Sequence, residues 1–348
     1  EQFMDDTLLL KEKWDSLRSE QPGLRIRAAA SVIGVSELEL LITQLGREVT
    51  ILRPEFNEIL IRAVGLGYVM ALTRNDDCVM ERKGYYANGI LDKALVGVFV
   101  GEAIDLRIFF NHWAYAFASM EQTEDRLKCS LQFFSKEGEA MHKIFLNDKS
   151  NVEHFHLLVD EFKSPSQQWE GIIAPKPEKE AEISDALIDV EGFRHEWISL
   201  RDTHEFFPMI YKYNLTRTQA LRLAPVGGYA VRVEEKTLRN VLKDAVKTQL
   251  PIMIFVANKG ALQIFTGRIN SLVDHNEWLN VLDPEFNLHL IESSIDQCWI
   301  VRKPTLDGFV TSVECFNSHG EQILQVFGKR KPGVEELQEW RKLVEVYG

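Results

Sequence analysis

Hydrophobic residues follow two different spacings along the chain, and each spacing predicts a different kind of element. Apolar residues that recur every three or four positions predict amphipathic helices. Such stretches come first in each half of the chain, and we expect helices over 6–20, 25–46 and 55–65 and over 197–213, 215–224 and 235–249. Each half also closes with a predicted helix, over 151–162 and 333–347.

Between these helices the apolar residues come in short, dense runs that are typical of β-strands. Turns separate the runs, for example at Asn258–Gly260 and at His319 and Gly320. In the second half the predicted strands lie within 252–269 and over the segments WLNVL, FNLHLI, CWIVRK, GFVTSVECF and ILQVF. Consecutive strands joined by short turns pair antiparallel. We therefore predict an α+β fold with two large antiparallel β-sheets flanked by helices.

The chain also repeats itself. Residues 130–146 and 312–328 align at a constant offset of 182, and both predict a strand, a turn and a second strand. The identical pairs are Ser130/Ser312, Phe134/Phe316, Gly138/Gly320, Glu139/Glu321 and Phe145/Phe327. The same offset relates 105–108 to 287–290, although Arg107 has His289 as its counterpart. We interpret the sequence as an internal duplication, with a period too long for a solenoid.

A connector separates the two copies. Residues 163–192 contain three prolines and a run of charges, which is typical of a linker. The predicted domains are an N-terminal repeat over 1–165, a linker over 166–192 and a C-terminal repeat over 193–348.

Composition and charge narrow the class of protein. Hydrophobic residues make up 45% of the 348, enough for a sizeable core, and no apolar run is long enough to span a membrane. A net charge of -12 without a basic stripe argues against nucleic-acid binding. The cysteines, Cys78, Cys129, Cys298 and Cys315, are scattered, and the first ten residues lack the pattern of a secretory signal. We expect a cytoplasmic protein without disulfides.

One histidine stands in a mostly apolar stretch, RDTHEFFPMI over 201–210. Asp202 and Glu205 have the spacing of a capping box, which predicts a helix start near Thr203. On a helix His204 would share a face with Leu200, Phe207 and Tyr211, and Pro208 would bend the turn or start a new one. The pattern alone leaves two interpretations open: a buried core histidine with satisfied hydrogen bonds, which is the commoner case, or a ligand.

Longer motifs decide between these interpretations. THEFF (203–207) is followed by NLTRTQAL (214–221), WIVRKPTLDGFVTS (299–312) and QVFGKR (325–330), and the first half contains IDLRIFFNHW (104–113). Together they resemble the haemin-degrading and haemin-trafficking family of the bacterial cytoplasm, the HemS/ChuS/PhuS group, over nearly the whole chain. The resemblance implies paired antiparallel sheets flanked by helices, with haem in a cleft of the second half that faces the first.

The resemblance also assigns roles to individual residues. His204 matches the axial ligand of the haem iron and is the metal-binding candidate, and it is also a catalytic candidate together with Arg107, which would donate a hydrogen bond on the distal side of the ring. The cofactor-binding candidates are His204, Arg107, Arg217, Lys303, Arg330, Phe206, Phe207 and Phe327. Among these, arginine suits the haem propionates because its planar fork pairs with carboxylates. Phe327 replaces a tyrosine expected in some relatives, and the nearest other histidine is His195.

The predicted function is haem binding followed by oxidative ring opening, which frees iron with electrons from an external reductant. Haem would then be the substrate. The alternative is a non-enzymatic carrier that delivers haem as cargo to a separate haem oxygenase. A third interpretation is a duplicated β module for another planar anion. The partners implied are haem, a reductase or haem oxygenase, and an inner-membrane haem importer, with a homodimer left open.

Overall fold

The computed structural model describes residues 2–92 and 95–348. The chain forms two compact units, which comprise residues 1–74, 81–177 and 258–262 and residues 75–80, 178–257 and 263–348. In the part of the chain that the structure describes, no helix is both long and apolar enough to cross a bilayer.

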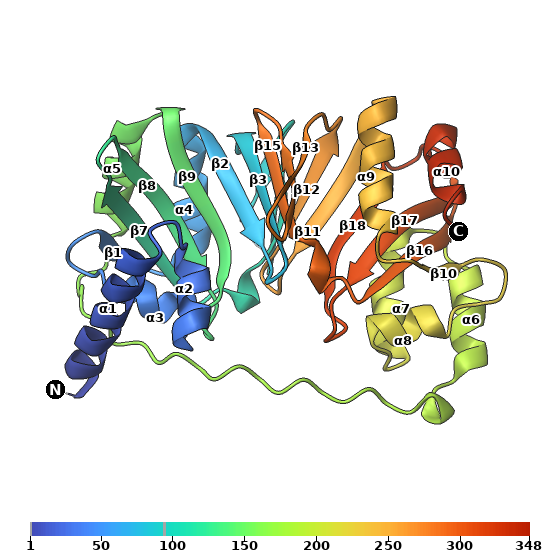
Figure 1. Cartoon of the computed structure of the whole chain (residues 1–348), viewed down its shortest axis with the longest axis horizontal. Helices are drawn as coiled ribbons and strands as arrows, with labels where there is room; N and C mark the ends of the chain where they lie inside the picture. The colour runs from blue at the N-terminus through green and yellow to red at the C-terminus, as the bar shows by residue number, and fades with distance from the viewer. Residues whose placement is uncertain (1, 93–94) are drawn as a thin grey trace. The chain divides into compact units, whose positions relative to one another are not determined.

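The N-terminal half begins with three helices and continues mainly with strands (Figure 1). Its helices are α1 (Gln2–Glu20), α2 (Ile26–Ile33), α3 (Glu37–Ile42), α4 (Phe56–Ala63) and α5 (Val152–Phe162). Its strands are β1 (Val49–Leu52), β2 (Gly67–Arg74), β3 (Cys78–Tyr85), β4 (Gly89–Ile90), β5 (Val96–Val100), β6 (Asp105–Phe109), β7 (Tyr115–Gln122), β8 (Leu127–Phe134) and β9 (Ala140–Ser150).

The C-terminal half follows the same order. Its helices are α6 (Val190–Ile198), α7 (Phe206–Lys212), α8 (Arg217–Arg222), α9 (Thr237–Thr248) and α10 (Gln338–Glu345). Its strands are β10 (Ala230–Val233), β11 (Ile252–Ala257), β12 (Ala261–Gly267), β13 (Leu272–His275), β14 (Trp278–Leu282), β15 (Phe286–Ile291), β16 (Gln297–Thr305), β17 (Gly308–Phe316) and β18 (Gln322–Gly328).

The strands confirm the predicted fold class and the duplication. Over the described residues they form two nine-stranded sheets, β1-β7-β8-β9-β2-β3-β15-β14-β13 and β10-β16-β17-β18-β11-β12-β6-β5-β4. Each strand of the first order corresponds to its counterpart in the other copy. The registers also agree, because Ser130 pairs with Phe145 and Ser312 pairs with Phe327. Both hairpins even contain an irregularity at the same repeat position, at Phe133/Phe134 and at Cys315/Phe316.

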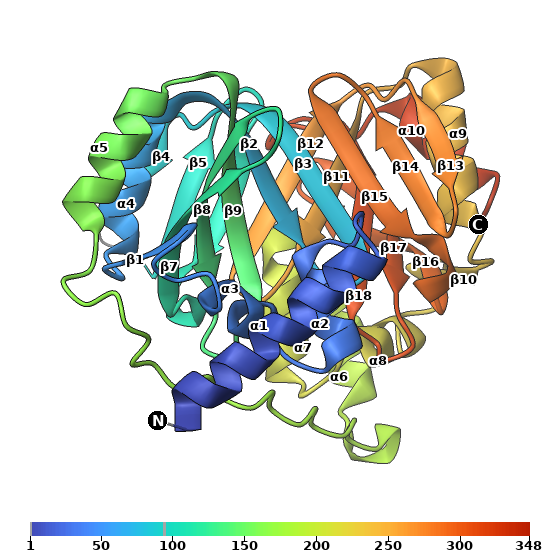
Figure 2. The same ribbon diagram turned by 60° about the vertical axis from the view of Figure 1, so that its left-hand side comes forward.

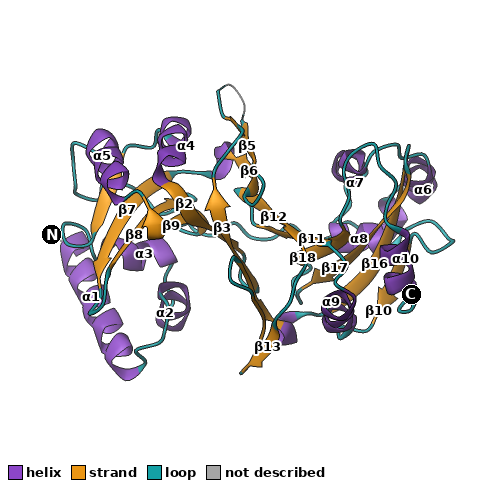
Figure 3. Ribbon diagram, turned by 90° about the horizontal axis from the view of Figure 1, so that it is seen from above, coloured by secondary structure: helices purple, strands orange, loops and turns teal. Residues whose placement is uncertain are grey.

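In the first unit, helices cover both faces of the strands. Figure 3 shows α4 and α5 on one side and α2 and α3 on the other, and Figure 2 shows α4 and α5 next to each other. Neighbouring residues of a strand point to opposite faces, so Phe133 packs in the core with α4 and α5 while Phe134 packs against α3. Both faces of β8 are therefore buried, which accounts for the dense apolar run in its sequence.

The second unit repeats this arrangement around β16. Ile300 points into a core formed with α9 and α10, whereas Trp299 and Val301 point to the opposite face, where they pack with α6, α7 and α8. The candidate ligand His204 immediately precedes α7. The packing of α6, α7 and α8 on this face therefore fixes where the candidate site lies.

Two predicted helices are each divided in two, and the predicted helix over 333–347 spans only Gln338–Glu345. The stretch 25–46 is two helices, because Gly34 ends α2 in a left-handed conformation and Ser36 caps α3 with a capping box. The stretch 197–213 is also divided: Asp189 caps α6, which ends at Ile198, and α7 starts only at Phe206. Caps of this kind are local signals, and they outweigh an apolar period that continues across the break.

Candidate functional site

His204 lies in a short 3-10 turn, Thr203–Glu205, at the entry to α7. The predicted capping box is present: the Asp202 carboxylate accepts the His204 backbone N–H at 2.8 Å, and Glu205 Oε1 accepts the Asp202 N–H at 2.9 Å. Pro208 falls in the first turn of α7, where its missing N–H removes no helical hydrogen bond. The turn therefore starts afresh, which is one of the two outcomes that Pro208 predicted.

The side chain of His204 is 90% exposed. This finding contradicts the interpretation of His204 as a buried core histidine. The predicted apolar stripe is also wrong, because Leu200 is buried while Phe207 and Tyr211 are exposed. The break between α6 and α7 separates Leu200 from the other three residues, so His204, Phe207 and Tyr211 face solvent.

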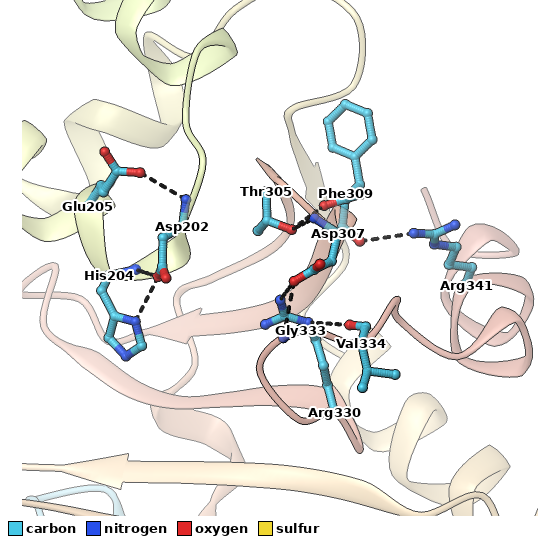
Figure 4. A network of polar contacts seen from close by, with 11 residues as sticks. Asp202, His204, Glu205, Thr305, Asp307, Phe309, Arg330, Gly333, Val334 and Arg341 are labelled. Carbon is cyan, nitrogen blue, oxygen red and sulfur yellow. Dashed lines mark hydrogen bonds and ion pairs between the residues drawn. The ribbon is translucent and has the colours of Figure 1, made fainter.

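The ring of His204 is oriented by a carboxylate. Its Nδ1 donates to Asp202 Oδ1 at 2.7 Å, as Figure 4 shows. The hydrogen bond from the His204 backbone lowers the pKa of Asp202, and the ring of His204 and the nearby charge of Arg330 add to that effect, so Asp202 is ionised at neutral pH. Among the described residues no protein group bonds Nε2. Protein metal sites hold ligating histidines in this way, with one ring nitrogen on a carboxylate and the other free for the metal.

Phe206 and Phe207 follow His204 but differ in their surroundings. Phe206 is buried, and its ring meets that of Trp197 edge-on at a centroid distance of 4.7 Å. Phe207 is 72% exposed. Phe327 is partly buried and lies against Phe255 at 4.8 Å between centroids. Phe207 thus exposes an apolar surface near His204 in the sequence. Phe206 instead packs into the core and holds the start of α7 against Trp197 of α6.

Arg217 and Lys303 converge on one buried carboxylate. Arg217 Nη2 lies 2.7 Å from Glu314 Oε1, and Lys303 Nζ lies 3.5 Å from Glu314 Oε2. Burial by itself raises the pKa of Glu314, but the two cations outweigh it and bring the pKa to about 2. Burial lowers the pKa of Lys303 to about 8, against the attraction of Glu314. Both cations also lie over the ring of Phe206, at 4.6 and 4.5 Å.

Arg330 is held separately. Its Nη2 lies 3.4 Å from Asp307 Oδ2, and its Nε donates to the carbonyl of Val334 at 3.2 Å (Figure 4). Leu306, in the turn between β16 and β17, donates its N–H to the carbonyl of Arg201 at 2.9 Å. That contact ties the β16–β17 turn to the segment that carries His204. In the second unit Arg330 therefore lies close enough to Asp202, which holds the His204 ring, for its charge to lower the pKa of Asp202.

Arg107 belongs to the first unit. It lies on β6, and its Nη1 is 2.5 Å from Asp105 Oδ1. Its proposed role on the distal side of a ligand stays a prediction. His195 is exposed on α6. No group of three or more histidine, cysteine or acidic side chains among the described residues could hold a metal ion, so the metal-binding prediction depends on His204.

A family model matches the chain twice. The model of the haemin-degrading HemS.ChuX domain matches residues 34–162 and again residues 214–347, which together are most of the chain. The chain belongs to this family. The two matches fall in the two copies that the repeat predicted, and the motif-based resemblance is confirmed.

Members of the HemS.ChuX family are similar over the full length. The hemin transport protein HmuS of Yersinia pestis is 37% identical over 338 residues, which cover 96% of each chain. Holo-PhuS, a heme-binding protein from Pseudomonas aeruginosa, superimposes with a TM-score of 0.95 at 41% identity and covers 98% of this chain and 99% of its own. The heme-degrading enzyme ChuS of Escherichia coli O157:H7 gives a TM-score of 0.91 at 32% identity, with coverage of 98% and 99%.

Sequence reasoning missed two acidic residues of the site. Asp202 was assigned only to a helix cap, yet it also orients the ring of His204. Glu314 went unnoticed in the strand GFVTSVECF, although a charged residue among buried apolar ones is itself a signal that it has a partner. Its partner Arg217 is 97 residues away in the sequence, and no local pattern connects them.

Proposed function

We propose that this chain binds haem with Nε2 of His204 as the axial ligand of the iron. The observation that carries the proposal is the exposed imidazole with Nδ1 fixed by an ionised aspartate. A single histidine suffices for haem because the porphyrin supplies the equatorial donors. Membership of the HemS.ChuX family and the similarity to a heme-binding PhuS support haem as the molecule that is bound.

The surrounding residues fit a flat apolar disc with an acidic edge. Phe207 and Phe327 would contact the ring, with Phe206 supporting them from the buried side. Arg217 and Arg330 would face the propionates, because guanidinium groups bind carboxylates through paired hydrogen bonds. Lys303 would contribute positive charge without touching the propionates, since its side chain is buried.

We further propose that the bound haem is opened oxidatively in the cytoplasm, with dioxygen as oxidant and electrons from an external reductant. Haem in that case is the substrate, and the protein supplies the ligand, the binding surface and hydrogen-bond donors. Similarity to ChuS, a heme-degrading enzyme, favours this activity. Similarity to HmuS, a hemin transport protein, favours the alternative, a carrier that passes haem from an importer to a separate oxygenase.

Spectroscopy under turnover conditions separates these functions. The protein is loaded with hemin, and ascorbate or an enzymatic reductant is added under air with catalase present, because free peroxide bleaches haem unaided. Loss of the Soret band with chelatable iron and a tetrapyrrole product supports the enzyme. A stable Soret band together with transfer to an oxygenase supports the carrier. The absence of any Soret shift on adding hemin excludes both.

Two histidine variants test the ligand itself. His204→Ala is expected to weaken hemin binding or to change the spin and ligation state seen in the absorption spectrum. His195→Ala is the matched control, since His195 is another exposed histidine of the same unit. If His195→Ala alters the spectrum and His204→Ala leaves it unchanged, the axial ligand has been assigned to the wrong histidine.

The proposed role of Arg107 is tested by the rate of haem degradation. Arg107→Gln is expected to slow the loss of the Soret band about tenfold or more, because a preorganised donor contributes mainly to the reaction step. Equilibrium hemin binding should change much less. Equal losses in rate and affinity would assign Arg107 to binding alone.

A further inference from the structure

The buried carboxylate of Glu314 is the centre of a complete hydrogen-bond network. Its Oε1 accepts from Arg217 Nε at 3.1 Å, from Arg217 Nη2 at 2.7 Å and from Gln322 Nε2 at 3.1 Å. Its Oε2 accepts from Ser312 Oγ at 2.8 Å and faces Lys303 Nζ at 3.5 Å. Glu314 itself is inaccessible to solvent. A carboxylate held by so many donors stays ionised and rigid.

This network occupies one edge of the Arg217 guanidinium and leaves the other edge open. Nε and Nη2 both donate to Glu314, whereas Nη1 has no partner among the residues that the structure describes. The Arg217 side chain is 21% exposed. Arg217 is also the first residue of α8, where Thr216 provides a capping box. Glu314 and the helix start therefore fix the guanidinium with a free donor.

The corresponding helix start of the first half carries an anion, and its ion pair uses a different strand of the sheet. Glu37 is the first residue of α3 and follows the capping residue Ser36, as Arg217 follows Thr216. Glu37 pairs with Lys143 of β9 at 2.8 Å, so here the helix carries the anion and the sheet carries the cation. Gln132 occupies the repeat position of Glu314. Of these two corresponding helix starts, α3 therefore begins with an anion and α8 begins with a cation.

We propose that Glu314 is a positioning residue that gives the second half its preference for a ligand with free carboxylates. It holds Arg217 so that Nη1 points away from the protein and receives a carboxylate of the ligand. Lys303, which is buried, pairs with the other oxygen of the same Glu314 carboxylate. The inference rests on the proposed function, in that the ligand is haem and the carboxylates are its propionates.

Net charge alone does not account for this role. With Glu314 ionised and both cations protonated, the cluster carries one positive charge. In Glu314→Gln the buried Lys303 loses its counter-ion, and the penalty of burial favours its neutral form. Arg217 stays charged in the variant, so the cluster is at least as positive as in the wild type. The substitution therefore removes the orientation of Arg217 and not the attraction for an anion.

The test compares two ligands, hemin and hemin dimethyl ester, whose propionates are blocked. Wild-type protein is expected to bind hemin more tightly than the ester, with the ratio of the two dissociation constants measured by Soret titration. Glu314→Gln should reduce that ratio about tenfold, mainly through weaker hemin binding, because the charged hydrogen bond from Arg217 Nη1 to a propionate is no longer held in place. A merely structural residue would weaken both ligands equally and leave the ratio unchanged, and that result overturns the proposal.

Glu336→Gln is the matched control. Glu336 is another buried carboxylate of the second unit, bonded to Thr311 Oγ1 at 2.9 Å and to Arg341 Nε at 3.1 Å. Its substitution should lower stability without changing the ratio. If Glu314→Gln fails to fold, the double variant Glu314→Gln/Lys303→Met removes the buried charge pair together and should show the same loss of ratio.

The two proposals fail in distinguishable ways. If wild-type protein gives no Soret shift with either ligand, the proposed function fails. If wild-type protein binds hemin and the Glu314 variants keep the wild-type ratio, only the role of Glu314 fails.

Discussion

Two histidines show how strongly the surroundings of a side chain decide its chemistry. His204 is open to solvent and has a carboxylate on Nδ1. His142 is buried in the first unit, with Nδ1 2.9 Å from Thr73 Oγ1 and Nε2 2.5 Å from the hydroxyl of Tyr86. His142 is thus the satisfied core histidine that His204 is not. Only the position whose second nitrogen is unpaired can bind a ligand.

The stability of the protein should depend on pH through His142. Burial lowers the pKa of His142 to about 3 from 6.5. Between these values the unfolded state binds the proton and the folded state does not, so stability is lost as pH falls below 6.5. The loss is about 2 kcal/mol at pH 5 relative to pH 7. Denaturant unfolding at both pH values should show a smaller loss in His142→Gln, and an equal loss would contradict the assignment.

Asp202 should control hemin affinity through the ring of His204. In Asp202→Asn the charge that orients the imidazole and raises its basicity is removed, so affinity should fall about 10- to 100-fold. Glu205→Gln is the control, since the amide oxygen still closes the capping box. Soret titrations of the two variants provide the measurement. Equal affinities would show that the turn alone, and not the carboxylate, places the ring.

At the scale of elements, turns and caps decide how the two copies are built. Gly138 and Gly320 occupy the same repeat position, with φ of 84° and 72° in the β8–β9 and β17–β18 turns. The copies differ in what lies above the turn. A Cβ at Gly138 would come within 2.5 Å of Ser36 Oγ, the cap of α3, whereas at Gly320 it would approach Lys179 Nζ at 3.3 Å. The β8–β9 turn therefore has no room for a side chain next to the start of α3. The β17–β18 turn meets the end of a lysine side chain, which can move.

Alanine substitutions at these glycines should therefore have unequal effects. Gly320→Ala should cost about 1 kcal/mol for the left-handed backbone alone. Gly138→Ala should cost about 2–3 kcal/mol, since Ser36 must also give up its cap. Denaturant unfolding monitored by circular dichroism measures both. Equal costs would mean that the α3 cap moves freely and contributes little to the turn.

At the scale of the whole molecule, the duplication conserved the strands and changed the chemistry. Both sheets have the same order of repeat-related strands. The turn that carries His204, the Arg217–Glu314 pair and Arg330 lie in the second unit, while α3 of the first unit begins with Glu37, which pairs with Lys143 of β9. A duplicated scaffold can keep the same strand order in both copies while the side chains of each copy diverge.

Hemin should therefore bind once per chain, at the turn and helix starts of the second unit. Hydrogen exchange with saturating hemin is expected to slow about tenfold or more in 203–222 and in β17, because ligand binding suppresses local opening. The corresponding segments of the first unit, α3 and β8, should exchange as in the free protein. A stoichiometry of two, or equal protection of α3 and β8, would show that the Glu37–Lys143 pair does not exclude the ligand from the first unit.

The sequence by itself determined most of the features that depend on neighbours along the chain. The strands, the glycine turns, the duplication and the Asp202–Glu205 capping box follow from spacing and residue type, because hydrogen-bonded turns and amphipathic faces are local. The family motifs also assigned roles to His204 and Arg217, and these roles stay predictions. Helix ends at Gly34 and Ile198 were missed, since an apolar period continued past a cap.

Only the tertiary structure decided exposure and partnership. The exposure of His204, the burial of Phe206 and the meeting of Arg217, Lys303 and Glu314 depend on how α6, α7 and α8 pack on the face of β16 and β17. Residues nearly one hundred positions apart come within hydrogen-bonding distance there. Periodicity states which residues share a face but not what covers that face, because covering elements arrive from distant parts of the chain.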